Sequence, residues 1–112
     1  MTFNILFLYT LNSNWLALNR QQREEFNATV VRPIVKRYSP RVSTRFCDAE
    51  AFTARCSDFA IFETDDLPSF YFMFEALRDT PLFSAPYLVV NDLIVGVRDG
   101  HDTYNTLVEE AV

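Results

Sequence analysis

Polar side chains that could do chemistry are densest in a stretch of eleven residues near the middle of the chain. This stretch contains Arg45, Asp48, Glu50 and Arg55, and it begins in a segment that alternates in the manner of a strand. If the alternation continues past Phe46, Asp48 and Glu50 point with Phe46 towards the core, where a carboxyl group must be paired or shifted in pKa. An acid held there beside an arginine would act as a general base or bind a polar group of a ligand.

A second interpretation of the same residues stays open. The strand can end at Cys47, in which case the charged side chains form ion pairs on the surface or cap free amide groups of a loop. Under the first interpretation the catalytic candidates are Asp48 and Glu50, and the ligand-binding candidates are Arg45, Arg55 and the hydrogen-bond donor Tyr9.

His101 is a third catalytic candidate, because it is the only side chain that titrates near neutral pH without any perturbation. Its neighbours Asp99, Gly100 and Asp102 are typical of an exposed turn, where a histidine is usually solvated. Metal binding by Asp99, His101 and Asp102 would require three ligands within four residues to reach one ion with good geometry. We therefore predict no metal site.

Cofactor binding has few candidate residues. Cys47 and Cys56 have no adjacent histidine and lie outside the glycine-containing patterns of cysteine proteases, so we interpret them as free thiols in the cytoplasm. One histidine and two cysteines argue against a zinc or haem site built from several soft ligands. Both glycines, Gly96 and Gly100, lie late in the chain, so it has no phosphate-cradling loop and no dinucleotide fingerprint. We expect no cofactor.

Length and composition indicate one globular domain over residues 1–112. The chain has 49% hydrophobic and 22% charged residues, with 11 phenylalanines to fill a core. Its net charge is −5, although seven of ten basic side chains lie between Arg20 and Arg45. A solvated helix face explains this basic stripe better than nucleic-acid binding does, because the rest of the chain is acidic. No segment has the length of a membrane span, and the N-terminus lacks the features of a signal peptide.

Periodicity and capping residues predict the order of the elements. Asn19 and Gln22 form a capping box before a long helix with Phe26, Val30, Ile34 and Tyr38 on its buried face, which Pro33 should bend. Strands are expected over residues 2–11, 42–47, 59–63 and 87–94, the last extending up to residue 97, and helices over 20–38, 65–79 and 103–111. This order predicts a ferredoxin-like α+β fold, a four-stranded antiparallel sheet with two helices on one face.

Several strands are apolar on both faces, which predicts a partner. Helices on one side of the sheet would leave Leu6, Leu8, Ala60, Phe62 and part of the fourth strand exposed. The simplest solution is a homodimer in which two sheets pack face to face, as in dimeric α+β barrels. The alternative is that the C-terminal tail folds under the sheet.

Aromatic side chains are numerous enough to line a pocket between helices and sheet, although most must be core. The candidates are Phe7, Tyr9, Phe62, Phe70, Tyr71, Phe72 and Phe74. Our leading hypothesis is a small-molecule-binding or cofactor-free enzyme-like module for a small apolar or aromatic ligand. The alternative is a non-catalytic interaction protein, and an enclosed pocket above about 300 Å³ would distinguish the two.

Three strings of residues resemble the darcynin family. They are RFCDAEAFTAR from Arg45, ETDDL from Glu63 and EALRDTP from Glu75, and the similarity extends to WLAL from Trp15 and RPI from Arg32. The resemblance implies a small bacterial protein of about this length. It implies no activity, substrate or catalytic residue, so no site residue is carried over from the family.

Overall fold

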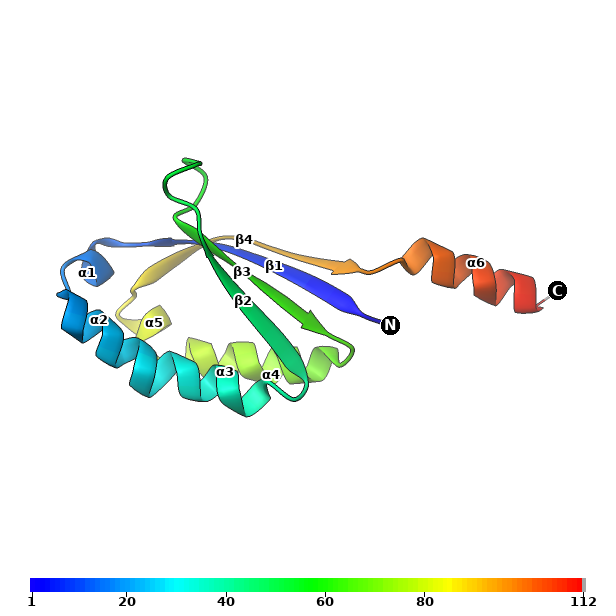
Figure 1. Cartoon of the computed structure of the whole chain (residues 1–112), viewed down its shortest axis with the longest axis horizontal. Coiled ribbons are helices and arrows are strands. Elements are labelled where there is room, and N and C mark those ends of the chain that lie inside the picture. Colours follow the sequence, from blue (N-terminus) through cyan, green and yellow to red (C-terminus); the bar gives the residue numbers. More distant parts are fainter. Residues whose placement is uncertain (112) are drawn as a thin grey trace.

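The computed structural model describes residues 1–111 and contains one four-stranded sheet (Figure 1). The strands are β1 (Phe3–Leu11), β2 (Val42–Asp48), β3 (Asp58–Thr64) and β4 (Leu88–Val97). They lie in the order β2-β3-β1-β4, and every neighbouring pair is antiparallel. This arrangement confirms the predicted ferredoxin-like fold.

Helices cover one face of the sheet (Figure 1). The first crossover consists of α1 (Ser13–Leu16), α2 (Arg20–Phe26), a π-helical turn η1 (Asn27–Val31) and α3 (Arg32–Tyr38). The second consists of α4 (Leu67–Arg78) and the short α5 (Pro81–Ser84), which was not predicted. A final helix, α6 (Gly100–Ala111), follows β4. No helix within residues 1–111 is long and apolar enough to cross a membrane.

The long first helix begins as predicted and widens where a bend was expected. The Asn19 side chain accepts from the Gln22 amide, and the Gln22 side chain accepts from the Asn19 amide. In a regular α-helix the ring of Pro33 would crowd the carbonyl group of Thr29. The chain instead forms a π-turn just before the proline, in which the Arg32 amide donates to the Asn27 carbonyl. The helix therefore continues through the proline by taking a wider turn.

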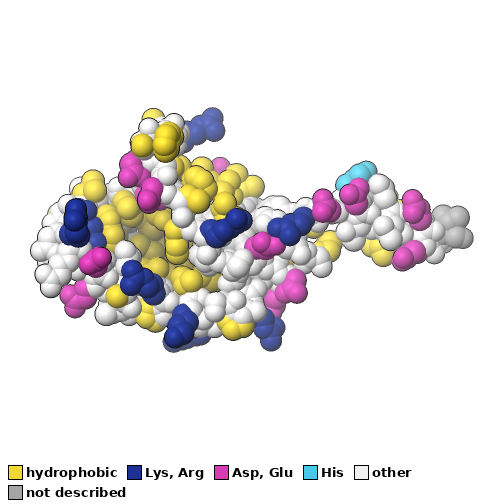
Figure 2. Space-filling model, in the orientation of Figure 1, with side chains coloured by type: hydrophobic (Ala, Val, Ile, Leu, Met, Phe, Trp, Pro, Cys, Tyr) yellow, Lys and Arg dark blue, Asp and Glu magenta, His cyan; other side chains and the backbone are white. Residues whose placement is uncertain are grey.

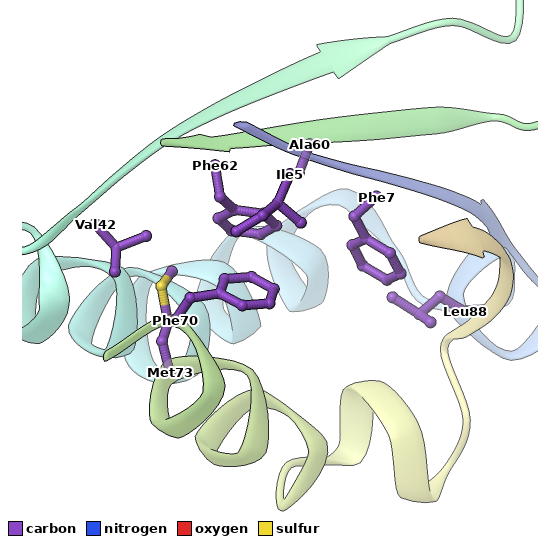
Figure 3. Close-up of a cluster of buried hydrophobic side chains, with 8 residues drawn as sticks. All are labelled: Ile5, Phe7, Val42, Ala60, Phe62, Phe70, Met73 and Leu88. Atoms are coloured by element: carbon purple, nitrogen blue, oxygen red, sulfur yellow. The ribbon is translucent and has the colours of Figure 1, made fainter. Parts of the chain in front are cut away.

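The hydrophobic core lies between the sheet and the helices. Ile5 of β1 points down towards Phe70 and Met73 of α4, and Phe7 points down towards Leu88 (Figure 3). Their buried partners complete the cluster, which comprises Ile5, Phe7, Val42, Ala60, Phe62, Phe70, Met73 and Leu88. The aromatic members pack closely, with 5.2 Å between the ring centroids of Phe62 and Phe70.

One side of β3 was predicted incorrectly. Ala60 and Phe62 were expected on the open face, but they are 0% and 1% exposed and face the helices. The cause is the register of the sheet: Ile5 lies opposite Phe62, and residues directly opposite in an antiparallel pair share a face. Phe59 and Ile61 occupy the open face instead, beside Leu8 and Leu6.

The C-terminal helix does not fold under the sheet. Figure 1 shows α6 standing beyond the end of β4, away from the helices and the open face. This arrangement leaves the open face free of α6, and the β2–β3 loop borders that face beside Leu6, Leu8 and Phe59.

Candidate functional site

A cavity of about 440 Å³ lies between the helices and one end of the sheet. Figure 2 shows a hollow with hydrophobic side chains on its walls. Aromatic and aliphatic residues from both layers form most of the lining, namely Phe7, Tyr9, Leu11, Trp15, Val31, Phe46, Phe62, Leu77, Leu82 and Leu88, and the polar lining residues are Asn27, Arg32, Asp48 and Asp58.

The π-turn supplies part of the helix wall. Asn27 and Val31 are the first and last residues of η1, and Arg32 follows them directly. Trp15 packs edge-on against Phe26 and Tyr87, with ring centroids 5.8 and 5.5 Å away. The widened helix and this aromatic cluster lie on the helix side of the cavity, at one end of the sheet.

The polar wall is a row of three side chains across three strands. Tyr9 of β1 lies opposite Asp58 of β3, and Asp58 lies opposite Asp48 of β2. Because residues directly opposite in antiparallel strands share a face, all three point to the helix side. The sheet register therefore brings together residues that are up to 49 positions apart in the chain.

Three carboxyl groups meet at this end of the sheet. Asp48, Glu50 and Asp58 each place a carboxylate oxygen within 4.8 Å of the others. Asp58 is buried, at 8% exposure. Burial raises the pKa of Asp58, and its hydrogen bond with Asp48 and the negative charges of Glu50 and Asp48 add to the increase. Carboxyl groups this close to one another titrate together and can share a proton, and their oxygen atoms are also suitable ligands for a hard cation.

The Tyr9 hydroxyl stays protonated beside these acids. Burial raises the pKa of Tyr9 above its ordinary value, and the charges of Asp58 and Asp48 raise that pKa further. The Tyr9 ring stacks on Phe7, with 5.0 Å between ring centroids. Tyr9 therefore offers a phenolic donor at a fixed place in the cavity wall.

Stability should fall with rising pH through Asp58. Its folded-state pKa is raised, so the folded protein binds this proton more tightly than the unfolded chain does. The contribution is fully present below the ordinary aspartate pKa and is lost as the pH rises from about 4 through the raised value. Urea titrations between pH 4 and 8 at one protein concentration should show this loss in the wild type and its absence in Asp58→Asn. An Asp65→Asn variant, at an exposed position, should keep the wild-type slope; equal slopes in all three proteins would contradict the prediction.

The candidate residues predicted from the sequence fall into separate places. Tyr9 and Asp48 line the cavity, and Glu50 lies beside Asp48. Arg45 lies opposite Ile61 on the open face, so it points away from the cavity. Arg55 borders a smaller apolar hollow of about 220 Å³ together with Leu6, Leu8, Ala49, Thr53, Cys56 and Phe59. Neither arginine forms an ion pair with a side chain of residues 1–111.

Other candidates also lie away from the cavity. His101 is exposed in the first turn of α6, a helix rather than the predicted turn. Tyr71 and Phe72 were expected to line the pocket, but they lie on the outer side of α4 at 60% and 57% exposure because Phe70 and Met73 form its buried face. Both Cys47 and Cys56 are free thiols.

Sequence reasoning missed Asp58, Trp15, Asn27 and Arg32 as lining residues. The strand predicted over residues 59–63 begins one residue after Asp58. The strand begins at Asp58 itself, and this position opposite Tyr9 makes it part of the site. Alternation gives no signal here, because Phe59, Ala60, Ile61 and Phe62 are all apolar.

Comparison with known proteins identifies the family. The family model described as "Darcynin, domain of unknown function" matches residues 2–111. The chain belongs to the darcynin family. Darcynin of Chromobacterium violaceum is 51% identical over 75 residues, which are 67% of this chain and 94% of that protein. Darcynin 1 of Acinetobacter baumannii is 38% identical over 91 residues, covering 81% of this chain and all of the relative.

Solved structures show the same fold at low sequence identity to this darcynin chain. Chlorite dismutase from Candidatus Nitrospira defluvii in complex with imidazole has a TM-score of 0.75 at 16% identity, over 86% of this chain and 39% of that one. A heme-binding protein from Thermus thermophilus has a TM-score of 0.74 at 15% identity, over 84% of this chain and 38% of that one. The chain thus spans less than half the length of these structural neighbours.

Proposed function

We propose that this darcynin-family protein binds a small apolar or aromatic molecule in the cavity between its helices and its sheet. The observation that carries the proposal is the cavity itself. Its volume of about 440 Å³ exceeds the 300 Å³ or so at which small-molecule pockets begin, and its lining combines apolar side chains with a few convergent polar groups.

The polar wall indicates the chemistry of the ligand. Ionised carboxylates only accept hydrogen bonds, so the ligand group beside Asp48, Glu50 and Asp58 should donate hydrogen bonds or carry a positive charge. Aromatic walls such as Phe7 and Phe46 suit both an aromatic body and a cationic group. An apolar amine satisfies these requirements better than an apolar acid.

The fold of a heme-binding neighbour raises haem as a candidate cofactor, but the residues of the cavity do not fit it. Haem iron in proteins is held by His, Cys, Met or Tyr. The lining contains none of the first three, and burial keeps Tyr9 in the protonated form that binds iron poorly. Carboxylates at the polar wall would also repel the propionates of haem. We therefore propose a ligand bound without haem.

An enzyme-like form of the proposal assigns proton transfer to the carboxyl groups. Asp48 and Asp58 are the acidic side chains that line the cavity wall. Neighbouring carboxyl groups with separated pKa values can divide the roles of proton acceptor and donor. This form of the proposal uses no cofactor.

A matched pair of probes tests the proposal. By isothermal titration calorimetry, 1-naphthylmethylamine should bind more tightly than 1-naphthylacetate, because the two differ mainly in the sign of their charge. Asp48→Asn should weaken binding of the amine about tenfold, the value of one charge-assisted hydrogen bond. Asp65→Asn, which changes an exposed acid outside the cavity, should leave it unchanged. If neither probe binds, or if the acid binds more tightly, the proposed ligand class is wrong.

We also propose that the open face joins two copies of the chain, which is the basis of the alternative function as a self-association protein. Leu6 lies beside Ile61 and Ile94, and Leu8 beside Phe59, so the centre of the face is apolar. Phe52, at 91% exposure, stands in the β2–β3 loop, which rises on the open side of the sheet in Figure 1. An exposed patch of this kind is typical of an interface.

The edges of the open face carry opposite charges. Arg45 stands on β2 at one edge, and Asp92 stands on β4 at the other, opposite Leu8. A two-fold axis parallel to the strands would place β2 of each copy over β4 of the other and bring Arg45 near Asp92 of the second copy. This complementarity supports a homodimer over an unrelated partner.

The free thiols support a cytoplasmic location.

A further inference from the structure

The helix wall of the cavity has polar residues of its own. Asn27 of η1 and Arg32 of α3 line the cavity from the helix layer, whereas Asp48 and Asp58 line it from strands β2 and β3. In Figure 2, acidic side chains lie at the upper rim of the hollow, below the β2–β3 loop, and a basic side chain lies at its lower rim, over the helices. The cavity therefore has two polar ends of opposite charge, one on each layer of the fold.

The π-turn places Asn27 and Arg32 on one side of the helix. The two residues are five positions apart, and such residues point about 140° apart around a regular α-helix. In η1 the Arg32 amide donates to the Asn27 carbonyl, so both residues lie on the same side of one wide turn. This geometry explains how both side chains line the same cavity, and it gives the wide turn a role in the site.

Local chemistry fixes this wide turn. Pro33 has no amide hydrogen and its ring would crowd the Thr29 carbonyl, so regular α-helical hydrogen bonding cannot pass through this position. The Thr29 hydroxyl donates to the Glu25 carbonyl at 2.7 Å, a bond of the kind that bends helices. The positions of Asn27 and Arg32 are therefore set within their own helix, before any ligand binds.

The guanidinium of Arg32 is available to an anion. None of the ion pairs within residues 1–111 includes Arg32, so it stays apart from the acids of the opposite wall although both line one cavity. A guanidinium binds a carboxylate through two parallel hydrogen bonds. The half-buried Asn27 amide can donate one more. The helix wall thus suits a ligand group that the acidic sheet wall would repel.

We propose that the ligand of this cavity is bipolar, with a cationic group at one end of an apolar or aromatic body and a carboxylate at the other. The cation meets Asp48 and Asp58, and the carboxylate meets Arg32 and Asn27. This inference rests on the proposed function, and it narrows the ligand from an apolar amine to an apolar amine that also carries a distant carboxylate. Because Arg32 is exposed and Asp58 is buried, solvent screens the arginine more, so a lone acid should still bind less tightly than a lone amine.

Derivatives of the amine probe test the second end of the ligand. 1-(Aminomethyl)naphthalene-4-carboxylate and 1-(aminomethyl)naphthalene-5-carboxylate add a carboxylate to 1-naphthylmethylamine at two distances from the ammonium group, and their methyl esters keep the shape without that charge. By isothermal titration calorimetry on the full chain, at least one carboxylate should bind about tenfold more tightly than its own ester, the value of one charge-assisted hydrogen bond. Arg32→Gln should remove this preference. Binding of the ester should stay unchanged in this variant, which also shows that the variant is folded.

A matched control and the opposite outcomes complete the test. Arg37→Gln removes the same charge from an exposed position of the same helix, outside the cavity lining, and should keep the preference. If 1-naphthylmethylamine binds but neither carboxylate exceeds its ester, the bipolar ligand is wrong and the proposed amine ligand stands. If none of the probes binds, both proposals fail. A preference that survives in Arg32→Gln would overturn the assignment of the carboxylate to Arg32.

Discussion

Leu6→Asp is expected to convert the proposed homodimer into a folded monomer. Leu6 is at the centre of the open face, between Ile61 and Ile94, where the second copy would exclude water. A carboxylate without a partner in such an interface costs several kcal/mol, so the dissociation constant should rise by about a hundredfold or more. Light scattering coupled to gel filtration measures the mass directly.

The monomer should keep its fold because Leu6 points away from the core. Thermal unfolding followed by circular dichroism, together with binding of 1-naphthylmethylamine, reports whether the helix side is intact. Leu16→Asp is the matched control, since Leu16 is 63% exposed on α1 and outside the open face. A Leu6→Asp protein that still forms dimers would show that the sheet face is not the interface.

Phe62→Ala is expected to lower the free energy of unfolding by about 3–5 kcal/mol, the range for truncating a buried phenylalanine. Phe62 is 1% exposed and packs on Phe70 with 5.2 Å between ring centroids. Urea unfolding in the Leu6→Asp background measures this loss without the concentration dependence of a dimer.

Phe72→Ala supplies the control for that experiment. The same side chain is removed from α4, but at 57% exposure, so the change should stay within about 0.5 kcal/mol. Equal effects of the two substitutions would mean that Phe62 lies on the open face, as the sequence pattern first indicated. The experiment therefore tests the register of β3 as well as the packing of the core.

Local signals in the sequence were sufficient for the order of the elements. Asn19 and Gln22 mark the start of the first helix, and the alternation of Phe3, Ile5 and Phe7 marks the first strand. These signals depend on neighbours within a few residues, which is why they can be read from one sequence. The resemblance to the darcynin family also held over residues 2–111.

Pairing across the sheet could not be predicted in the same way. In β3, Phe59, Ala60, Ile61 and Phe62 are all apolar, so alternation cannot tell which face is buried, and a shift of one residue exchanges the two faces. For the same reason the sequence does not show that Asp58 belongs to the site. Asp58 joins the site only because it lies opposite both Tyr9 and Asp48. The site depends on register, and register depends on contacts between distant segments.

The π-turn before Pro33 has a consequence for chain length in this family. A π-turn holds one more residue than the α-helical turn it replaces, so deleting one residue from Asn27–Val31 would restore a regular helix. The residues after the deletion would keep their places around the helix axis, so Ile34 and Tyr38 would still pack against the core. A gap of one residue within these five positions is therefore a length change that natural relatives should tolerate. A relative with such a gap should also have lost the proline.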